Sequence, residues 1–412
     1  MTHVRIKSVV RNVVQKSDGA SSPFLGLEDI EGGTGRLLVK ELPRKAAEDS
    51  ICHESGDVLF SKLRPYLAKS YLPNAKGTGT GELLVLRPSA EVNAKFLIYV
   101  TLSSPWVEWA NTTAYGTKMP RTSWELVGDY RTWLPPLEEQ RRIADFLDAE
   151  TARIDALTSR RKVQQQLLVE RRAALKTECV TYSGPQKVHH PLLGDIHPDW
   201  QVLPLRRILP AINVGVVINP SHYFTESGVP FIHGFNVREG FISQVGMKFM
   251  SGESNELHRR SRVYVGDVLV VRAGATAGRA AKVGEEFDGA NCASVLILRK
   301  SETLDAAYLE TFLNAVAGKG QVSFSQYGAA QEVISAGQVS SFSIALPPMS
   351  EQVERVAELS AATAETVALE SGLTRQVALL SERRQALITA AVTGQFDVST
   401  ASGRHVTDGV SA

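Results

Sequence analysis

The stretch LPPLEEQ at Leu134–Gln140 recurs as LPPMSEQ at Leu346–Gln352, and this repetition decides the fold. The charged segments that follow end in ERRAAL at Glu170–Leu175 and in ERRQAL at Glu382–Leu387. Both pairs are 212 residues apart (346 minus 134, and 382 minus 170), and the same offset aligns Tyr115–Thr177 with a second copy without a gap. Roughly half of the aligned positions from Leu134 onwards are identical, which indicates an internal duplication.

The bulk properties are those of an ordinary globular protein with room for two or three domains in 412 residues. A formal net charge of +1 argues against a protein that coats nucleic acid, but it allows a local basic groove. Cys52, Cys179 and Cys292 match no metal or redox spacing, which indicates a reducing compartment. The sequence shows no apolar signal region and no run of about 18 apolar residues. We therefore expect a cytoplasmic protein without membrane contact.

Each copy of the repeat consists of a globular region followed by a long helix. Short runs such as GDVLF, GELLVL and KFLIYV (Lys95–Val100) in the first region, and GDVLVV and ASVLIL in the second, are of β type. The Pro-Pro pairs suit helix starts, and Ser183-Gly184-Pro185 and Thr393-Gly394 are stop signals. The sequence predicts an α+β protein with six parts: a first mixed α/β domain (1–133), a spacer helix (134–183), a linker (184–193), a second mixed α/β domain (194–345), a second spacer helix (346–394) and a disordered tail (395–412).

Both helices carry a narrow apolar stripe with a seven-residue period, which is typical of a coiled-coil seam. A stripe that packs only on its own globular region is the alternative. Because the stripe is narrow and the rest of the surface is polar, we expect the two helices to pair with each other. If the halves are equivalent, the pair is antiparallel with a pseudo-twofold relation, and a helix of about 40 residues is roughly 60 Å long. The predicted seam residues are Leu147, Ile154, Leu168, Leu175, Leu359, Leu373, Leu380 and Leu387.

Several stretches together resemble the specificity subunit of type I restriction–modification enzymes. The two LPP segments and their ERR endings resemble the paired conserved regions of that family. Four further stretches resemble parts of its target-recognition domains: FLGLEDIEGGTGRL (Phe24–Leu37), GDVLFSKLRPYLAK (Gly56–Lys69), GTKMPRTSWELVGDYRTWLPP (Gly116–Pro136) and GDVLVVRAGATAGRAAKV (Gly266–Val283).

The resemblance implies a subunit without catalytic activity of its own. Each target-recognition domain would read one half of a bipartite, asymmetric target in double-stranded DNA. The coiled coil would set the unspecified gap and dock two adenine-N6 methyltransferase subunits, which use S-adenosylmethionine. Restriction subunits that translocate DNA with ATP and Mg can join the complex, so this chain itself is expected to bind no cofactor.

Basic loops follow equivalent strands in the two halves and are the candidate DNA contacts. Both loops lack acidic residues and carry the lysines and arginines that phosphate contact needs, together with side chains that can read bases. An ordinary solvated loop is the alternative for any single residue. The globular regions differ most before Tyr115 and Tyr327, which favours an asymmetric over a palindromic target. The predicted DNA-binding residues are Ser61, Lys62, Arg64, Tyr66, Lys69, Lys118 and Arg121 in the first half, and Arg272, Thr276, Arg279, Lys282, Gln326 and Gln331 in the second.

Two other functions compete with this interpretation. One is a coiled-coil adaptor whose heads bind protein partners rather than DNA. The other is a self-sufficient DNA-modifying enzyme, but the Pro-Pro pairs follow Leu134 and Leu346, which cannot supply the polar contact to a flipped adenine. AGKGQ (Ala317–Gln321) also lacks the Ser/Thr of a phosphate loop. The histidines at 189, 190 and 197 lack partners at zinc spacing, so we expect surface residues and no metal site.

Overall fold

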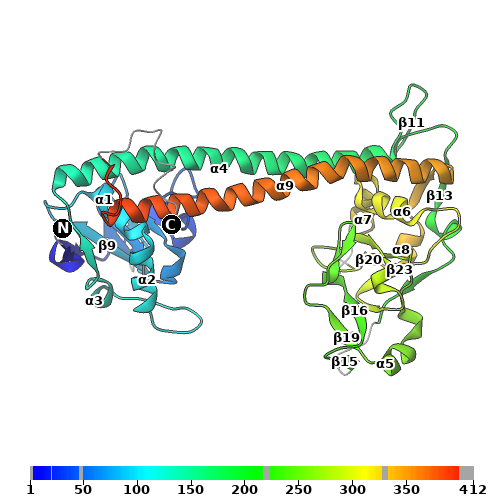
Figure 1. Cartoon of the computed structure of the whole chain (residues 1–412), viewed down its shortest axis with the longest axis horizontal. Helices are drawn as coiled ribbons and strands as arrows, with labels where there is room; N and C mark the ends of the chain where they lie inside the picture. Colours follow the sequence, from blue (N-terminus) through cyan, green and yellow to red (C-terminus); the bar gives the residue numbers. More distant parts are fainter. Residues whose placement is uncertain (1–2, 20, 46–49, 217–222, 327–332, 399–412) are drawn as a thin grey trace. The chain divides into compact units, whose positions relative to one another are not determined.

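The protein folds into two compact units, each with a globular head and parts of two long helices. The computed structural model describes residues 3–19, 21–45, 50–216, 223–326 and 333–398. The first unit comprises Met1–Val163 and Leu373–Ala412, and the second comprises Gln164–Gly372. The long helices are α4 (Leu137–Val180) and α9 (Met349–Val392) (Figure 1). The expected mixture of two α/β domains and two long helices is confirmed.

In its described residues, the first head contains two four-stranded sheets, one two-stranded sheet and three short α-helices. Its strands are β1 (His3–Arg5), β2 (Val10–Asn12), β3 (Ser22–Leu25), β4 (Arg44–Lys45), β5 (Ile51–His53), β6 (Val58–Ser61), β7 (Ser70–Tyr71), β8 (Gly77–Gly79), β9 (Leu83–Pro88) and β10 (Arg131–Trp133). Its helices are α1 (Ala94–Leu102), α2 (Ser104–Thr112) and α3 (Trp124–Val127). The strand orders are β2-β9-β6-β7 and β4-β3-β8-β5, and β1 pairs with β10.

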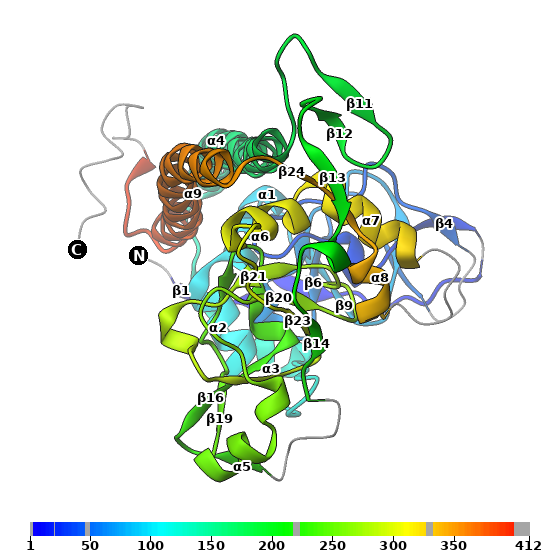
Figure 2. The same ribbon diagram turned by 90° about the vertical axis from the view of Figure 1, so that its right-hand side faces the viewer.

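The second head repeats this plan. Its strands are β11 (Val188–His190), β12 (Gly194–Ile196), β13 (Gln201–Pro204), β14 (Ile212–Val214), β15 (Phe224–Thr225), β16 (Val229–His233), β17 (Val237–Arg238), β18 (Phe241–Ile242), β19 (Lys248–Met250), β20 (Val268–Val271), β21 (Ala280–Lys282), β22 (Asn291–Ala293), β23 (Val295–Leu298) and β24 (Ser343–Leu346). Its helices are α5 (Gly252–Leu257), α6 (Ala306–Asn314), α7 (Val316–Gln326) and α8 (Ala336–Ser340). Figure 2 shows α6 between the helix pair and the sheet with the order β14-β23-β20-β21.

Strand pairing shows which parts of the heads are equivalent. The antiparallel order β2-β9-β6-β7 corresponds to β14-β23-β20-β21. In the other sheet β3 runs parallel to β8, as β16 runs parallel to β22. The register places Phe24 opposite Thr78 in the first head and Phe231 opposite Asn291 in the second. The internal duplication therefore extends from the helices into both heads.

One predicted strand is a helix. The run KFLIYV lies in α1, and the prediction of β structure there is wrong. Asn93 caps the helix, since its side chain accepts a hydrogen bond from the N–H of Phe96 at 3.1 Å. The helix is buried from Phe96 to Leu102, and all of these residues except Thr101 are apolar. The run therefore shows no period that separates a helix from a strand.

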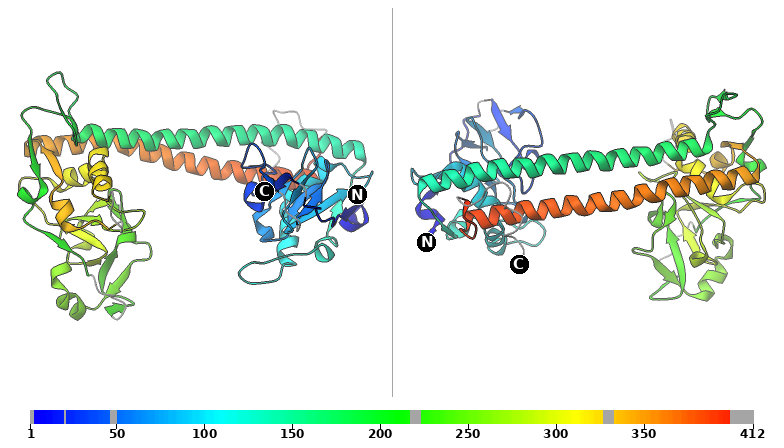
Figure 3. Two further views of the ribbon diagram at one scale, coloured as in Figure 1. Left: turned by 180° about the vertical axis from the view of Figure 1, so that it is seen from behind. Right: turned by 45° about the horizontal axis from the view of Figure 1, so that its top comes forward.

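The long helices are antiparallel where they meet. In the second unit, Arg172 of α4 pairs with Glu370 of α9 at 2.7 Å, and nine residues further along the chain the carbonyl of Thr181 accepts a hydrogen bond from Arg355 at 3.0 Å. The residue number of the α9 partner therefore falls as that of the α4 residue rises, as it does in an antiparallel pair. Figure 3 shows the helices side by side within each unit.

The buried faces of the helices follow a strict heptad pattern. The inward positions of α4 are Gln140, Ala144, Leu147, Thr151, Ile154, Thr158, Arg161, Gln165, Leu168, Arg172, Leu175 and Cys179, and those of α9 lie 212 residues later. Every one of these side chains is buried or partly buried. The eight predicted seam residues occupy one of the two heptad positions. The other position is largely polar in α4, with threonine, glutamine and arginine side chains.

The repeated LPP motif has a structural explanation. Gln140 is fully buried, and its amide nitrogen donates to the carbonyls of Glu91 and Pro135, each at 2.9 Å. Gln352 makes the equivalent bonds to Thr303 and Pro347. The motif therefore joins the start of each long helix to the segment that precedes α1 or α6.

The GDV sequences also have equivalent roles. Asp57 and Arg87 form a doubly hydrogen-bonded ion pair with both N–O distances at 2.7 Å. Asp267 and Arg299 pair at 2.6 Å in the second head. Both carboxylates are almost completely buried, and a buried ion pair with further hydrogen bonds fixes geometry more than it adds stability. These pairs hold the strands β6 and β20 that lead into the basic loops.

The remaining segments are short. The predicted linker contains β11, which forms a hairpin with β12 at the start of the predicted second domain. In this hairpin His189 Nδ1 lies 2.9 Å from Asp195 Oδ1. Residues 399–412 of the predicted tail lie outside the described residues. Among the described residues, no helix combines the length and apolar character that crossing a bilayer requires.

Candidate nucleic-acid interface

Two loops with the same backbone path follow β6 and β20. The first basic loop is Lys62–Lys69 and the second is Arg272–Arg279. Each is closed by a hydrogen bond of 2.9 Å, from Ser61 N to Lys69 O in the first and from Val271 N to Arg279 O in the second. Within each loop an i to i+3 bond of 2.9 Å follows, from Leu67 N to Arg64 O or from Ala277 N to Gly274 O. The loops therefore present their side chains from equivalent positions.

Left-handed residues shape both loops. Gly274 and Gly278 have φ of +80° and +86°, a region that glycine enters without strain. The first loop has Arg64 and Ala68 at the equivalent places, with φ of 49° and 47°. A non-glycine residue in this region costs about 1–3 kcal/mol, and such strain clusters at functional sites. The strained Arg64 is therefore a candidate for a functional role.

The first loop offers some of its predicted residues to solvent and uses others internally. Tyr66 is half exposed, and Lys62 and Arg64 are partly exposed. Lys69 Nζ donates to the carbonyl of Leu27 at 2.5 Å. Ser61 is only 1% exposed and its hydroxyl donates to Leu63 O, so it shapes the loop and we remove it from the proposed interface.

Lys118 and Arg121 lie in the segment between α2 and α3 (Figure 1). Lys118 is exposed. Arg121 forms an ion pair with Glu82 at 3.0 Å, which raises the pKa of the guanidinium through hydrogen bonding and charge. The backbone of Arg121 pairs with Tyr115 and bridges to Leu63, so this segment lies beside the first basic loop.

The second half gathers fewer of its predicted residues. Arg272, Thr276 and Arg279 lie in the second basic loop and are partly exposed. Lys282 pairs with Val268, at the opposite end of the hairpin from the loop, so the structure separates it from the other three. Gln326 ends α7, and Gln331 lies outside the described residues.

A cleft of about 370 Å³ lies against the second basic loop. Its lining includes Thr276 and Arg279, together with three side chains that were not predicted from the sequence: His233, Phe235 and Arg238. The rings of His233 and Phe235 are stacked, with centroids 5.2 Å apart. Burial lowers the pKa of His233, and the charge of Lys248 lowers it further. A hydrogen bond to the backbone of Phe231 opposes this shift without reversing it.

The segment that forms this cleft has a counterpart in the first head. The stretch FIHGFNVREG after β16 corresponds to FLGLEDIEGG after β3, which the sequence already singled out. In both, a buried apolar residue, Ile30 or Val237, comes three positions before a left-handed glycine, Gly33 or Gly240. This parallel was the signal that could have led to the cleft residues.

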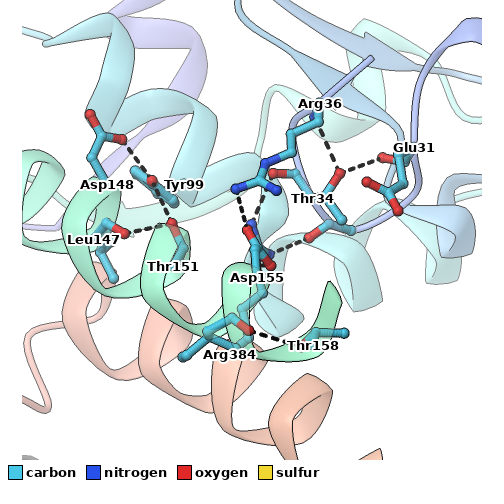
Figure 4. A network of polar contacts seen from close by, with 12 residues as sticks. Glu31, Thr34, Arg36, Tyr99, Leu147, Asp148, Thr151, Asp155, Thr158 and Arg384 are labelled. Atoms are coloured by element: carbon cyan, nitrogen blue, oxygen red, sulfur yellow. Dashed lines mark hydrogen bonds and ion pairs between the residues drawn. The ribbon is translucent and has the colours of Figure 1, made fainter. Parts of the chain in front are cut away.

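A polar network joins the first head to the long helices (Figure 4). Arg384 of α9 donates to the carbonyls of Gly33 and Thr34 at 2.6 and 2.9 Å. Its Nε lies 3.2 Å from the carboxylate of Asp155 on α4, which also pairs with Arg36 at 2.6 Å. The loop after β3 is thus held by both helices at once.

In the second unit, a glutamate and two lysines connect the equivalent loop to a long helix. Glu239, in the equivalent loop, accepts hydrogen bonds from Lys176 of α4 at 3.2 Å and Lys319 of α7 at 2.7 Å. Burial by itself raises the pKa of Glu239, but the two ammonium groups outweigh it and lower the pKa. In each unit, the loop beside the basic loop is therefore fixed to a long helix.

Comparison with known proteins shows what this chain is similar to. Residues 236–379 match the family described as the type I restriction modification DNA specificity domain. The EcoKI specificity subunit of Escherichia coli K12 is 24% identical over 421 residues, which cover 95% of this chain and 87% of that protein. This chain resembles type I specificity subunits. The resemblance expected from the sequence motifs is confirmed.

Solved structures show the same fold. A chain from a type I restriction–modification system, solved to explain complex assembly and conformational transition, matches with a TM-score of 0.76 and 22% identity over 96% of this chain and 98% of its own. The HsdS subunit of Thermoanaerobacter tengcongensis matches with a TM-score of 0.50 and 21% identity over 96% of this chain and 97% of its own. The likeness therefore includes both heads and both long helices.

Proposed function

We propose that this chain is the DNA specificity subunit of a type I restriction–modification complex. Each head reads one half of a bipartite, asymmetric target in double-stranded DNA. The observation that carries this proposal is a shared scaffold with different side chains at equivalent places: Lys69 and Arg279 close their loops in the same way, but Tyr66 corresponds to Thr276. A conserved frame with variable contact residues suits two readers of different sequences.

Exposed leucines on the long helices support the docking of two copies of one partner. Leu157 and Leu369 occupy equivalent positions and are 37% and 49% exposed. Leu167 and Leu379 are a second equivalent pair, 56% and 51% exposed. Exposed apolar patches mark protein contacts, and we take the recurrence of these leucines at matched sites as support for such patches on both helices. We assign them to two methyltransferase subunits, which bring S-adenosylmethionine, while restriction subunits bring ATP and Mg.

The proposed role includes no catalytic step by this chain. The backbone carbonyl of Pro136 accepts the N–H of Gln140 at 3.0 Å, and that of Pro135 accepts its side chain. The Pro-Pro segment therefore builds a helix start, whereas an adenine methyltransferase uses a polar Pro-Pro loop to hold its flipped base. The chemistry would belong to the partner subunits.

Mapping of methylated adenines tests the function directly. Cells that carry this chain with its methyltransferase subunit should methylate one bipartite motif whose two halves differ. Replacement of residues 1–133 by another head should change one half-site only. Methylation without a fixed motif, or a change in both half-sites, would overturn the proposal.

Charge reversal separates DNA reading from an adaptor role. Lys62→Glu together with Arg272→Glu places a carboxylate in each basic loop, and specific DNA binding should be lost while the methyltransferase still binds. The matched control is Arg207→Glu with Arg383→Glu, two exposed arginines outside the loops. If the loop variant still binds its DNA target as the wild type does, the basic loops do not contact DNA. If the wild type itself binds no specific DNA while the methyltransferase binds, the adaptor role is favoured.

A further inference from the structure

The lining of the cleft beside the second basic loop suits the edge of a planar ring that carries hydrogen-bond acceptors. Three loops meet at it, following the carboxyl ends of β16, β20 and β22. Phe235, half exposed, supplies an apolar wall, and Val237 and Val271 supply an apolar floor. Thr276 and Ser294 supply hydroxyl groups. The volume of about 370 Å³ lies within the usual range of small ligand sites, roughly 300–1,000 Å³.

Two guanidinium groups at the cleft have no charge partner among the described residues. Arg238 and Arg279 line the cleft and make no ion pair or side-chain hydrogen bond there. The nearest carboxylate along the chain, Glu239, is already bonded to Lys176 and Lys319. Both arginines are therefore free to donate to a ligand with hydrogen-bond acceptors.

The first head presents different groups at the equivalent places. Arg238 corresponds to Glu31, since each directly follows a buried apolar residue and lies two positions before a left-handed glycine. Arg279 corresponds to Lys69, whose ammonium is bonded to the carbonyl of Leu27. A pair of free guanidinium groups is thus a property of the second head, and the first head offers a carboxylate instead.

We propose that this cleft reads a guanine in the half-site of the second head, with Arg238 and Arg279 as the residues that determine the base. The inference rests on the proposed function and adds the base and the residues. Guanine presents two acceptors, O6 and N7, in the major groove, and arginine donates to both at once. Cytosine and adenine present amino donors there, which the carboxylate of Glu31 would suit better than Arg238 does. The two heads would then differ in base preference at matched positions.

Selection from randomised duplexes tests the proposal with the full chain in complex with its methyltransferase subunit. The second head's half-site is the one that persists when residues 1–133 are exchanged. The wild type should prefer guanine at one position of that half-site. Arg238→Glu should lower this preference by about 5- to 150-fold, the range of one bidentate contact, and leave the other half-site unchanged.

A second variant and a control make the result decisive. Arg279→Lys keeps the charge but removes the planar fork, so it should also lose discrimination at that position. Arg207→Glu, an exposed residue of the same head, should keep the wild-type preference. Thermal melting of each variant shows that the fold is retained.

The possible results distinguish failure of the guanine proposal from failure of the proposed function. If the wild type selects a bipartite motif and both cleft variants keep its guanine preference, the reading by this cleft is wrong while the function remains. If the variants lose affinity equally for all sequences, the arginines contact phosphate and the guanine proposal also fails. If the wild type selects no motif, the proposed function itself fails.

Discussion

The side chain of Gln140 accepts a hydrogen bond from the backbone N–H of Asn93 at 2.8 Å, and so connects the first turn of α4 to the residue that caps α1. Gln352 and Asp305 repeat this contact at the same distance between α9 and α6. A buried glutamine at equivalent positions of the two halves therefore connects each head to the start of a long helix.

Removal of this amide should destabilise the unit that contains it. Gln140→Ala deletes three hydrogen bonds and leaves one N–H and two carbonyls unsatisfied inside the protein. We expect a loss of about 3 kcal/mol in the free energy of unfolding, measured by urea denaturation. Gln376→Ala changes an exposed glutamine of α9 and should cost less than about 0.5 kcal/mol. Equal effects of the two changes would contradict this role.

The network around Asp155 should respond to the loss of Arg384. The Arg384 side chain is only 9% exposed, and Arg384→Met leaves the carbonyls of Gly33 and Thr34 without their donor. Removing one partner of a buried ion pair costs about 3–5 kcal/mol. Arg383→Met, at the exposed neighbouring position, is the control. Amide hydrogen exchange of residues 31–36 should rise in the first variant and stay constant in the second.

Acidic pH should lower the free energy of unfolding of the first head, because His53 is buried there. Burial lowers the pKa of this imidazole below its usual value of 6.5, and the charge of Asp57 opposes the shift only in part. Neither ring nitrogen has a hydrogen-bond partner among the described residues. Because the unfolded chain takes up this proton more readily, the contribution is complete above pH 6.5 and is lost as the pH falls through the lowered folded-state pKa.

His53→Leu provides the measurement. Denaturation midpoints of the wild type should fall more steeply than those of the variant between about pH 7 and pH 5. Above pH 7.5 the difference between the two proteins should be constant. Parallel profiles over the whole range would show that His53 does not contribute to acid sensitivity.

Salt dependence should distinguish phosphate contact from base reading. Lys118 is exposed and was assigned to the DNA surface from its sequence context. Lys118→Ala should weaken binding of every sequence alike and flatten the plot of log affinity against log salt by about one unit. Met119→Ala, at an exposed apolar neighbour, should leave the slope unchanged. An unchanged slope in the lysine variant would remove it from the interface.

The sequence predicted the elements that repeat and missed those that depend on tertiary contacts. The strands GDVLF and GDVLVV were recognisable because β-branched and aromatic residues fill a buried sheet. The helix at KFLIYV was not, because the run is apolar almost throughout and shows no helical period. Polar seam positions such as Thr151 and Arg172 were also missed, since burial of a polar side chain has no signature in an apolar pattern.

The sequence predicted the part of the candidate interface that lies in the repeated strands and loops, and missed the part that only tertiary contacts bring together. The two basic loops were matched from sequence because both follow a strand in a run without acidic residues. The structure shows in addition that Lys62 and Arg272 lie at equivalent positions of these loops. Phe235 and Arg238 were missed because they lie more than 30 residues before the second basic loop, and only the folded chain brings them to the cleft that this loop lines.

The division of the first unit has a consequence for biosynthesis. Its apolar core includes Leu387, Ile388 and Val392 next to residues of the amino-terminal head. After Val163 the ribosome must add about 210 further residues to reach Leu373, which takes on the order of 10–40 s at 5–20 residues per second. The second unit is continuous and can complete its core first. The amino-terminal head, although made earlier, is finished last, and chaperones have that interval in which to shield its open apolar surface.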